Sequence, residues 1–285
     1  MYKRQLPKVS THNPHQNLLF YPVRGIRRKN LGEICLLAAH APENTRFAIA
    51  LRSTAEEPAH IHDDWVHFAK EQNLSIDFDV VANEPDTFPH WLAQATHIIT
   101  TSISEGFGLT FLDSAFLNKP LIGRNLPAIT TDFPAYGTLY QDIPIPISKI
   151  PDLESHYRDQ LAKTMNAYQQ ALTEEQLTDA WKKHTATGTV DFGNLPENLQ
   201  RDLIKNHPLP ELTHWLNKAL TQPAQNIEKS PWTLETYITR LQKILTQTHP
   251  SPPSKTLAHL DQKTIQNQFL SPAQFHFLRT HHKKS

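Results

Sequence analysis

Short apolar runs alternate with amphipathic stretches along the chain from Asn17 to about Gly123. The runs have the length and the Ile, Leu, Val and Phe content of buried strands, and the stretches between them carry apolar residues at helical spacing. In one stretch Ile61, Trp65 and Phe68 fall on a single face. The pattern predicts strands at Leu18–Val23, Arg46–Leu51, Ile76–Val81, His97–Thr101 and Leu121–Gly123, and helices at Leu31–His40, Ala59–Gln72, Thr87–Ala95 and Thr110–Asn118.

This alternation is typical of βαβ units. Strands separated by helices of about ten residues pair in parallel and are joined by right-handed crossovers. We therefore predict an α/β fold with a Rossmann-like parallel sheet in residues 17–150, followed by a helical region. Ligands of such sheets bind beyond the carboxyl ends of the strands, so functional residues are expected at those ends.

The strand signal disappears after about Ile150. The residues that follow have helical periodicity and helix start signals, such as Thr173 and Gln176 at the spacing of a capping box. We predict a helical extension over residues 151–285. Its predicted helices are Leu153–Leu172, Glu174–His184, Pro196–Asn206, Pro231–Gln247 and Pro272–His281.

The first residues of the chain are unusual. The sequence MYKRQ is the translation of ATGTATAAGAGACAG, which resembles the end of a transposase adapter used in sequencing-library preparation. We expect residues 1–16 to be a disordered arm with an artefactual start. An ordinary polar arm is the alternative interpretation.

The charge balance and the cysteine count argue against several classes of protein. The chain has 28 basic and 28 acidic residues, spread evenly over its two halves, so neither half has the basic excess of a nucleic-acid binder or a membrane-surface protein. The single cysteine excludes an internal disulfide framework, and we expect Cys35 to be a buried thiol. No apolar run in the sequence reaches the length of a membrane span, and we expect a cytoplasmic protein.

Four cations follow the first predicted strand within a few residues: Arg24, Arg27, Arg28 and Lys29. A loop that leaves a strand and enters a helix presents free backbone N–H groups and the positive end of the helix dipole. Cations added there suit a doubly charged anion such as a diphosphate. A solvated basic loop is the other interpretation.

A glycine loop follows the fourth predicted strand, in the sequence TSISEGFGLTFLD of residues 101–113. Gly106 and Gly108 allow unusual φ values and a close approach of the backbone to a ligand. Glu105 in the turn and Asp113 inside the following helix are carboxylates, which suit the recognition of hydroxyl groups. A plain glycine turn is the alternative interpretation.

The two segments together resemble the C-terminal, donor-binding domain of GT-B glycosyltransferases. The closest resemblance is to the retaining enzymes related to sucrose-phosphate and glycogen synthases. That family has Arg and Lys five positions apart after the first strand of this domain, matched by Arg24 and Lys29, and a Glu-x7-Glu signature with a Gly-Phe-Gly-Leu core, matched by residues 105–113. The resemblance implies the catalytic residues Arg24, Lys29 and Glu105 and the donor-binding residues Ser102, Gly106, Phe107, Gly108, Leu109, Thr110 and Asp113.

The resemblance also implies individual roles. Arg24 and Lys29 grip the donor diphosphate, Glu105 holds hydroxyl groups of the donor sugar, and the second acidic position contacts the nucleotide ribose. There are three departures from the family: Val23 and Asn30 stand where it has glycines, and Asp113 is one methylene shorter than the usual glutamate.

The resemblance covers about residues 17–135. In this family an acceptor-binding domain precedes the donor-binding domain, and residues 1–16 are too few to form one. We therefore expect the chain to be a truncated fragment that is inactive alone, with the missing N-terminal acceptor domain as its partner.

The implied activity is the transfer of a hexose from a nucleotide sugar, such as a UDP- or GDP-sugar, to an unknown acceptor with retention of configuration. The cations of the protein neutralise the diphosphate in this scheme, so we expect neither a metal nor another cofactor. The alternative is a non-catalytic nucleotide-sugar-binding protein whose helical half docks a partner.

Two further groupings are interpreted as structural. A set of polar residues lies opposite the apolar face of the second predicted helix, and we interpret it as a solvated face rather than a metal site. Residues 190–193, VDFG, are interpreted as a turn. The polar set consists of His60, His62, Asp63, Asp64 and His67.

Overall fold

A six-stranded parallel sheet forms the centre of the computed structural model, which describes residues 17–82, 84–106, 108–131, 137–224 and 234–246. Its strands are β1 Asn17–Gly25, β2 Thr45–Arg52, β3 Ile76–Asp77, β4 His97–Thr100, β5 Leu121–Arg124 and β6 Thr138–Tyr140. The order is β3-β2-β1-β4-β5-β6, so the direction of strand addition reverses between β1 and β4. The predicted α/β fold with a Rossmann-like sheet is confirmed.

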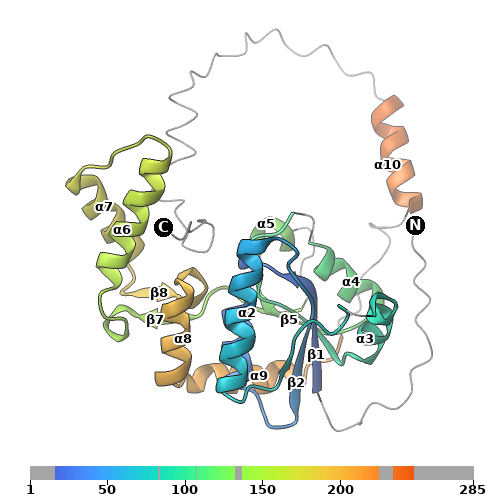
Figure 1. The fold of residues 1–285 in the computed structure, drawn as a ribbon. Coiled ribbons are helices and arrows are strands. Elements are labelled where there is room, and N and C mark those ends of the chain that lie inside the picture. The colour runs from blue at the N-terminus through green and yellow to red at the C-terminus, as the bar shows by residue number, and fades with distance from the viewer. Residues whose placement is uncertain (1–16, 83, 107, 132–136, 225–233, 247–285) are drawn as a thin grey trace.

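Helices cover both faces of this sheet (Figure 1). They are α1 Leu31–Ala39, α2 Glu56–Glu71, α3 Phe88–Gln94, α4 Leu109–Leu117 and the short α5 Pro127–Thr130. Successive side chains of β1 point to opposite faces. Leu19 and Tyr21 join a buried cluster with α1 and α2, and Leu18 and Phe20 join a second one with α3 and α4. Because β1 is buried on both faces, its sequence reads as a continuous apolar run.

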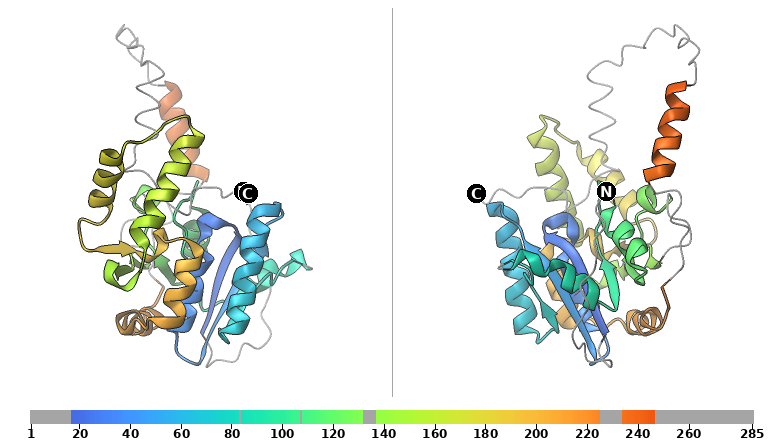
Figure 2. Two further views of the ribbon diagram at one scale, coloured as in Figure 1. Left: turned by 60° about the vertical axis from the view of Figure 1, so that its left-hand side comes forward. Right: turned by 90° about the vertical axis from the view of Figure 1, so that its right-hand side faces the viewer.

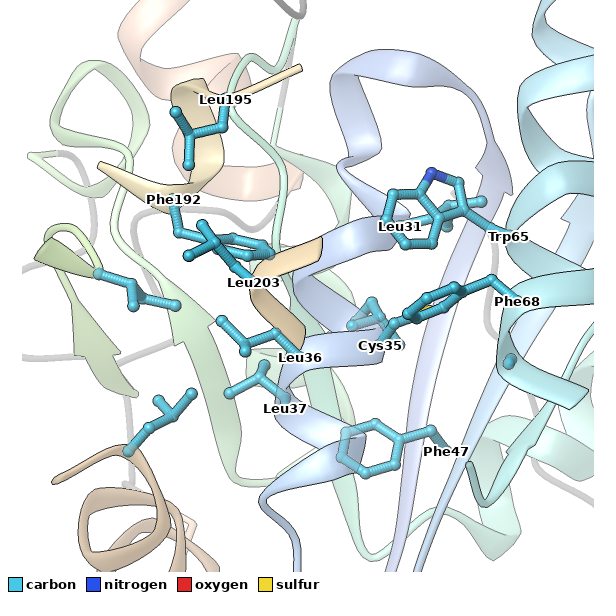
Figure 3. Packing of buried hydrophobic residues seen from close by; sticks show 14 of the residues in the cluster. Leu31, Cys35, Leu36, Leu37, Phe47, Trp65, Phe68, Phe192, Leu195 and Leu203 are labelled. Atoms are coloured by element: carbon cyan, nitrogen blue, oxygen red, sulfur yellow. The ribbon is translucent and has the colours of Figure 1, made fainter. Parts of the chain in front are cut away.

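Part of the second half of the chain, mainly helix α8, packs against α1. The helices of this half are α6 Leu153–Ala167, α7 Glu174–His184, α8 Glu197–Asn206, α9 Pro210–Leu220 and α10 Leu234–Thr246. Leu203 of α8 and Phe192 belong to the same buried cluster as Leu36 of α1. Figure 3 shows this cluster, with Leu203 and Phe192 on one side of α1 and Trp65 and Phe68 of α2 on the other.

A small antiparallel sheet lies in the second half, where β7 Pro144–Pro146 pairs with β8 Thr189–Asp191. Between these strands the chain forms the α6–α7 hairpin, which has its own apolar cluster around Tyr157 and Leu161 and is set apart from the large sheet in Figure 2. The prediction that strands cease after about Ile150 is therefore wrong, because a three-residue strand such as β8 is too short to show alternation. The VDFG segment is not a turn but the end of β8 and a 3₁₀ helix, Phe192–Asn194.

The third strand is shorter than predicted. The expected strand Ile76–Val81 ends at Asp77, and Asp79 has a left-handed φ of 60°. This conformation turns the backbone out of the strand, although the amide of Val80 still donates to a β2 carbonyl at 3.2 Å.

Helix ends in the second half follow local signals that the sequence showed only in part. The capping box between Thr173 and Gln176 is present at the start of α7, as predicted. The helix predicted to run to Leu172 ends earlier, and Gln169 has a φ of 60° there. Helix α9 was not predicted, although Pro210 at its first position is a start signal.

Two predictions concern residues outside those that the structure describes. These are the arm of residues 1–16 and the helix Pro272–His281, whereas the helix predicted at Pro231–Gln247 corresponds to α10. Within the described part of the chain, no helix has both the length and the apolar character needed to cross a membrane.

Stability should depend on pH through His97 of β4. Burial lowers the pKa of His97 to about 4, helped by the Lys119 charge and opposed by a backbone hydrogen bond with Leu220. Between about pH 6.5 and pH 4 the unfolded chain binds a proton that the folded chain does not bind, so acidification through this window lowers the free energy of unfolding. We expect a loss of up to about 3 kcal/mol from this group, measured by urea unfolding at a series of pH values.

A pair of variants isolates this contribution. H97Q should flatten the acid dependence, whereas H67Q, at a side chain that is 77% exposed, should leave it as in the wild type. An acid dependence of the same slope in H97Q and the wild type would contradict the assignment.

Candidate functional site

Two loops meet at the carboxyl ends of the two central strands. The loop after β1 passes through a 3₁₀ helix, Arg27–Lys29, into α1, and the loop after β4 passes through residues 101–108 into α4. β1 and β4 are hydrogen-bonded neighbours, and the helices that follow them lie on opposite faces of the sheet. Parallel sheets bind ligands at such a switch point. The structure therefore brings the two predicted motifs together.

Main-chain groups bind the two loops to each other. The amide of Ile103 donates to the Arg28 carbonyl at 3.0 Å. The Thr101 hydroxyl is within 2.8 Å of the Lys29 carbonyl and 3.2 Å of the Asn30 carbonyl, and it donates to both. These hydrogen bonds, from residues of the second loop to carbonyls of the first, join the two loops.

Lys29 and Glu105 form a direct ion pair between the loops, and each side chain is 8% exposed. The carboxylate of Glu105 also accepts a hydrogen bond of 2.6 Å from Ser102, whose hydroxyl lies 2.6 Å from that of Tyr21. Burial lowers the pKa of Lys29, and Glu105 opposes this effect; burial raises the pKa of Tyr21. An ammonium group and a carboxylate are thus held side by side, and Ser102 fixes the orientation of the carboxylate.

The arginines of the first loop differ in their surroundings: Arg24 and Arg28 are exposed, whereas Arg27 pairs with a residue of α8. Arg24 is exposed at the end of β1. Arg28 is 44% exposed, donates to a backbone carbonyl of the second loop at 3.1 Å and lies 3.6 Å from Glu105. Arg27 turns to α8 and donates two hydrogen bonds to Glu197, at 2.8 and 3.0 Å. The expectation that all four cations face one anion is therefore corrected for Arg27.

Among the described residues of the glycine loop, Gly108 has a left-handed conformation. Gly108 has φ 66° and ψ 35° just before α4, and a Cβ at this position would collide with the Ile129 side chain. Gly106 does not have a positive φ, and a Cβ there would meet no atom within 4 Å, so it does not use the conformational freedom that glycine allows. At the start of α4, Leu109 is 64% exposed and Thr110 is buried.

The remaining predicted binding residues lie at different depths. Ser102 is fully buried, so its hydroxyl holds Glu105 in this arrangement. Asp113 is half-buried on α4, and Phe107 lies outside the described residues.

Asn30 closes the first loop and begins a buried polar network. It stands where the resembling family has a glycine and has φ 51° and ψ 62°, a left-handed conformation that Asn adopts more readily than most residues. Its side-chain amide donates to Glu33 at 2.7 Å. Arg124 donates to Glu33 at 2.6 Å and to Asp191 at 2.9 Å, and the Tyr140 hydroxyl donates to Glu33 as well.

This network was not predicted from the sequence. The signal in the sequence was the position of Glu33 within the apolar run LGEICLLAA. Glu33 is fully buried, and a buried carboxylate requires a cation or hydrogen-bond donors beside it. Burial raises the pKa of Glu33 and the Arg124 charge opposes this shift; for Arg124, burial acts to lower the pKa but the charges of Glu33 and Asp191 raise it overall. The network therefore holds charged groups that depend on one another.

Sequence predictions were also made for Cys35 and His62, which lie outside the two loops. Cys35 is a buried thiol, as predicted. His62 is fully buried, with Nε2 3.1 Å from the Asp79 carboxylate, so the prediction of a solvated face is wrong for this residue. Among the residues that the structure describes, no three His, Cys, Asp or Glu side chains gather as metal ligands would.

Comparison with known proteins returns sugar-transferring enzymes. No family model matches the chain. The mannosylglucosyl-3-phosphoglycerate synthase of Petrotoga mobilis is 26% identical over 196 residues, which cover 66% of this chain and 37% of that protein. The chain thus spans little more than a third of the length of this curated relative.

Solved structures of GT-B glycosyltransferases also match. TarM covers 85% of this chain and 38% of its own, with 12% identity and a TM-score of 0.39. The pneumococcal O-GlcNAc transferase GtfA covers 82% of this chain and 36% of its own, with 15% identity and a TM-score of 0.36. For the sucrose-phosphate synthase of Thermosynechococcus elongatus the values are 81%, 46%, 13% and 0.36.

Proposed function

We propose that the chain binds a nucleoside-diphosphate sugar at the switch point of its sheet and acts as the donor-binding part of a glycosyltransferase. The observation that carries the proposal is the Lys29–Glu105 pair, which joins the two predicted motifs across β1 and β4. The exposed cations Arg24 and Arg28 lie on the same loop as Lys29. The sequence relationship to a mannosylglucosyl-3-phosphoglycerate synthase is in keeping with sugar transfer.

The two partners of the pair suit the two halves of such a donor. An ammonium group binds a diphosphate, and a carboxylate accepts hydrogen bonds from sugar hydroxyls. Each side chain is only 8% exposed because the two groups contact each other. A donor bound by both groups therefore replaces part of the Lys29–Glu105 contact.

In the proposed reaction an acceptor hydroxyl attacks the anomeric carbon on the face from which the diphosphate leaves, so the configuration is retained. The new bond joins the acceptor oxygen to that carbon, the bond to the phosphate oxygen breaks, and the acceptor proton passes to the departing phosphate. Negative charge grows on the diphosphate, where Arg24, Arg28 and Lys29 stabilise it. Glu105, held by Ser102, orients the sugar. In this scheme the cations of the chain take the place of a metal.

The proposal is tested by calorimetric titration of the chain with UDP, GDP and ADP and with the corresponding monophosphates. We expect at least one diphosphate to bind at least about tenfold more tightly than its monophosphate, because the loop cations bind the second phosphate. The preferred diphosphate should also raise the melting temperature. The absence of binding for every diphosphate at millimolar concentration would rule the proposal out.

A second assay separates transfer from simple binding. The nucleotide sugar that binds best is incubated with candidate hydroxyl acceptors, and release of the diphosphate is followed. A non-catalytic binding protein would bind the donor in the titration but release no diphosphate with any acceptor.

A further inference from the structure

The loop that carries Lys29 has little support of its own. Its 3₁₀ helix, Arg27–Lys29, is one turn long and is closed by hydrogen bonds from the amides of Lys29 and Asn30, at 2.8 and 2.9 Å. Asn30 then reverses the backbone in a left-handed conformation before α1 begins. A loop of this length holds one conformation only if the surrounding structure fixes it.

Besides its hydrogen bonds and ion pair with the second loop, this loop has two contacts with helix α8, and the first is made by Arg27. The guanidinium of Arg27 donates through Nε and Nη2 to the two carboxylate oxygens of Glu197, at 2.8 and 3.0 Å. The side chains are 10% and 16% exposed, so this two-bond contact is largely shielded from water. Such a bidentate pair fixes orientation as well as distance.

The second contact lies one turn further along α8. Gln200, which is 1% exposed, donates to the side-chain oxygen of Asn30 at 3.2 Å and to the Phe192 carbonyl at 3.0 Å. Helix α8 comes this close because Gly32 has no side chain: a Cβ there would collide with Gln200 and with the Trp65 ring. The sequence of α1 is therefore adapted to the approach of α8.

These contacts hold the loop on both sides of Lys29, at Arg27 and at Asn30. We propose that Glu197 and Gln200 are positioning residues for diphosphate binding, acting through the loop rather than touching the ligand. This inference rests on the proposed function, since Lys29 is the group whose placement they fix. It assigns to the helical half a role in the donor site, which the resemblance had placed only in the α/β half.

The test measures binding of the preferred diphosphate among UDP, GDP and ADP, and of its monophosphate, by calorimetric titration. We expect E197A to weaken diphosphate binding by about 5- to 10-fold, because the loop loses its fixed geometry. Monophosphate binding should change by less than about twofold, since the loop is needed mainly for the second phosphate. E197Q, whose side-chain oxygen still accepts from Arg27, should recover part of the loss.

The matched control is E154A, which removes a glutamate that pairs with Arg158 at 2.8 Å on α6, away from the loop. A role confined to stability would lower the melting temperature of E197A without selective loss of diphosphate binding. Equal diphosphate affinity in E197A and the wild type would overturn the inference and leave the proposed function intact. Failure of the wild type to bind any diphosphate would instead reject the proposed function, and this inference with it.

A double-mutant cycle checks the route of the effect. If Glu197 acts through Arg27, then R27M, E197M and the double variant should lose similar diphosphate affinity, so the losses are not additive. Additive losses would show that the two residues act independently and would also overturn the inference.

Discussion

Replacing Arg124 by methionine should destabilise the protein by about 3–5 kcal/mol, the cost of breaking a buried ion pair by removing one partner. Glu33 is fully buried and receives two hydrogen bonds from Arg124 at its Oε2, 2.6 and 3.2 Å long. Without the guanidinium this carboxylate has no cation within the network. Guanidinium-chloride unfolding of R124M and the wild type at pH 7 measures the difference.

The pH dependence of this loss has a definite sign. In R124M burial keeps the pKa of Glu33 above its ordinary value, with no opposing charge, so the folded protein holds a proton that the unfolded chain releases. Stability then falls as the pH rises through the range above the ordinary glutamate pKa. The difference between R124M and the wild type should therefore be larger at pH 7 than at pH 5.

Two further variants show whether burial of the charge is the cause. The double variant E33Q/R124M should regain part of the loss because it removes the unpaired charge. R158M breaks ion pairs at a more exposed position and should cost at most about 1 kcal/mol. A value for R124M within 1 kcal/mol of the wild type would show that the network contributes far less than its burial implies.

The second large effect is expected at Lys29. Replacement by methionine should weaken binding of the preferred nucleoside diphosphate by about 30- to 100-fold, or about 2–3 kcal/mol, because it removes a charge-assisted contact in a partly buried place. Calorimetric titration measures this change. K218M, which removes an exposed lysine of α9, is the matched control and should bind as the wild type does.

Lys29 also stabilises Glu105, so a loss of binding could reflect a loosened fold. The double variant K29M/E105Q removes both charges of the pair. We expect it to regain stability relative to K29M while diphosphate binding stays weak. Recovery of binding in the double variant would mean that Lys29 serves the fold rather than the ligand.

The central strands and both site loops could be predicted because their signals are local. β1 and β4 are buried on both faces and therefore read as apolar runs, and the glycine and cation motifs lie within a few residues of these strands. By contrast, β8 is three residues long and has no recognisable period. A pattern method detects an element only when it contains enough residues to repeat.

The long-range pairs could not be predicted in the same way. Arg124 and Glu33 are 91 positions apart, and Arg27 and Glu197 are 170 positions apart. Charge and position alone do not distinguish the four cations of the first loop as groups that bind a ligand, and only the family resemblance singles out Arg24 and Lys29. The fold shows that Arg27 is directed to Glu197 of α8, whereas Arg28 donates to the second loop.

The close fit of α8 against α1 also bears on how such a chain can change during evolution. Gly32 and Gln200 must suit each other, and Leu36 shares a buried cluster with Leu203. A recombination event that joined this sheet to the second half of a distant relative would break these matched contacts at once. The sheet and α8 are therefore expected to be inherited together, and a side chain at position 32 would require changes at both Gln200 and Trp65.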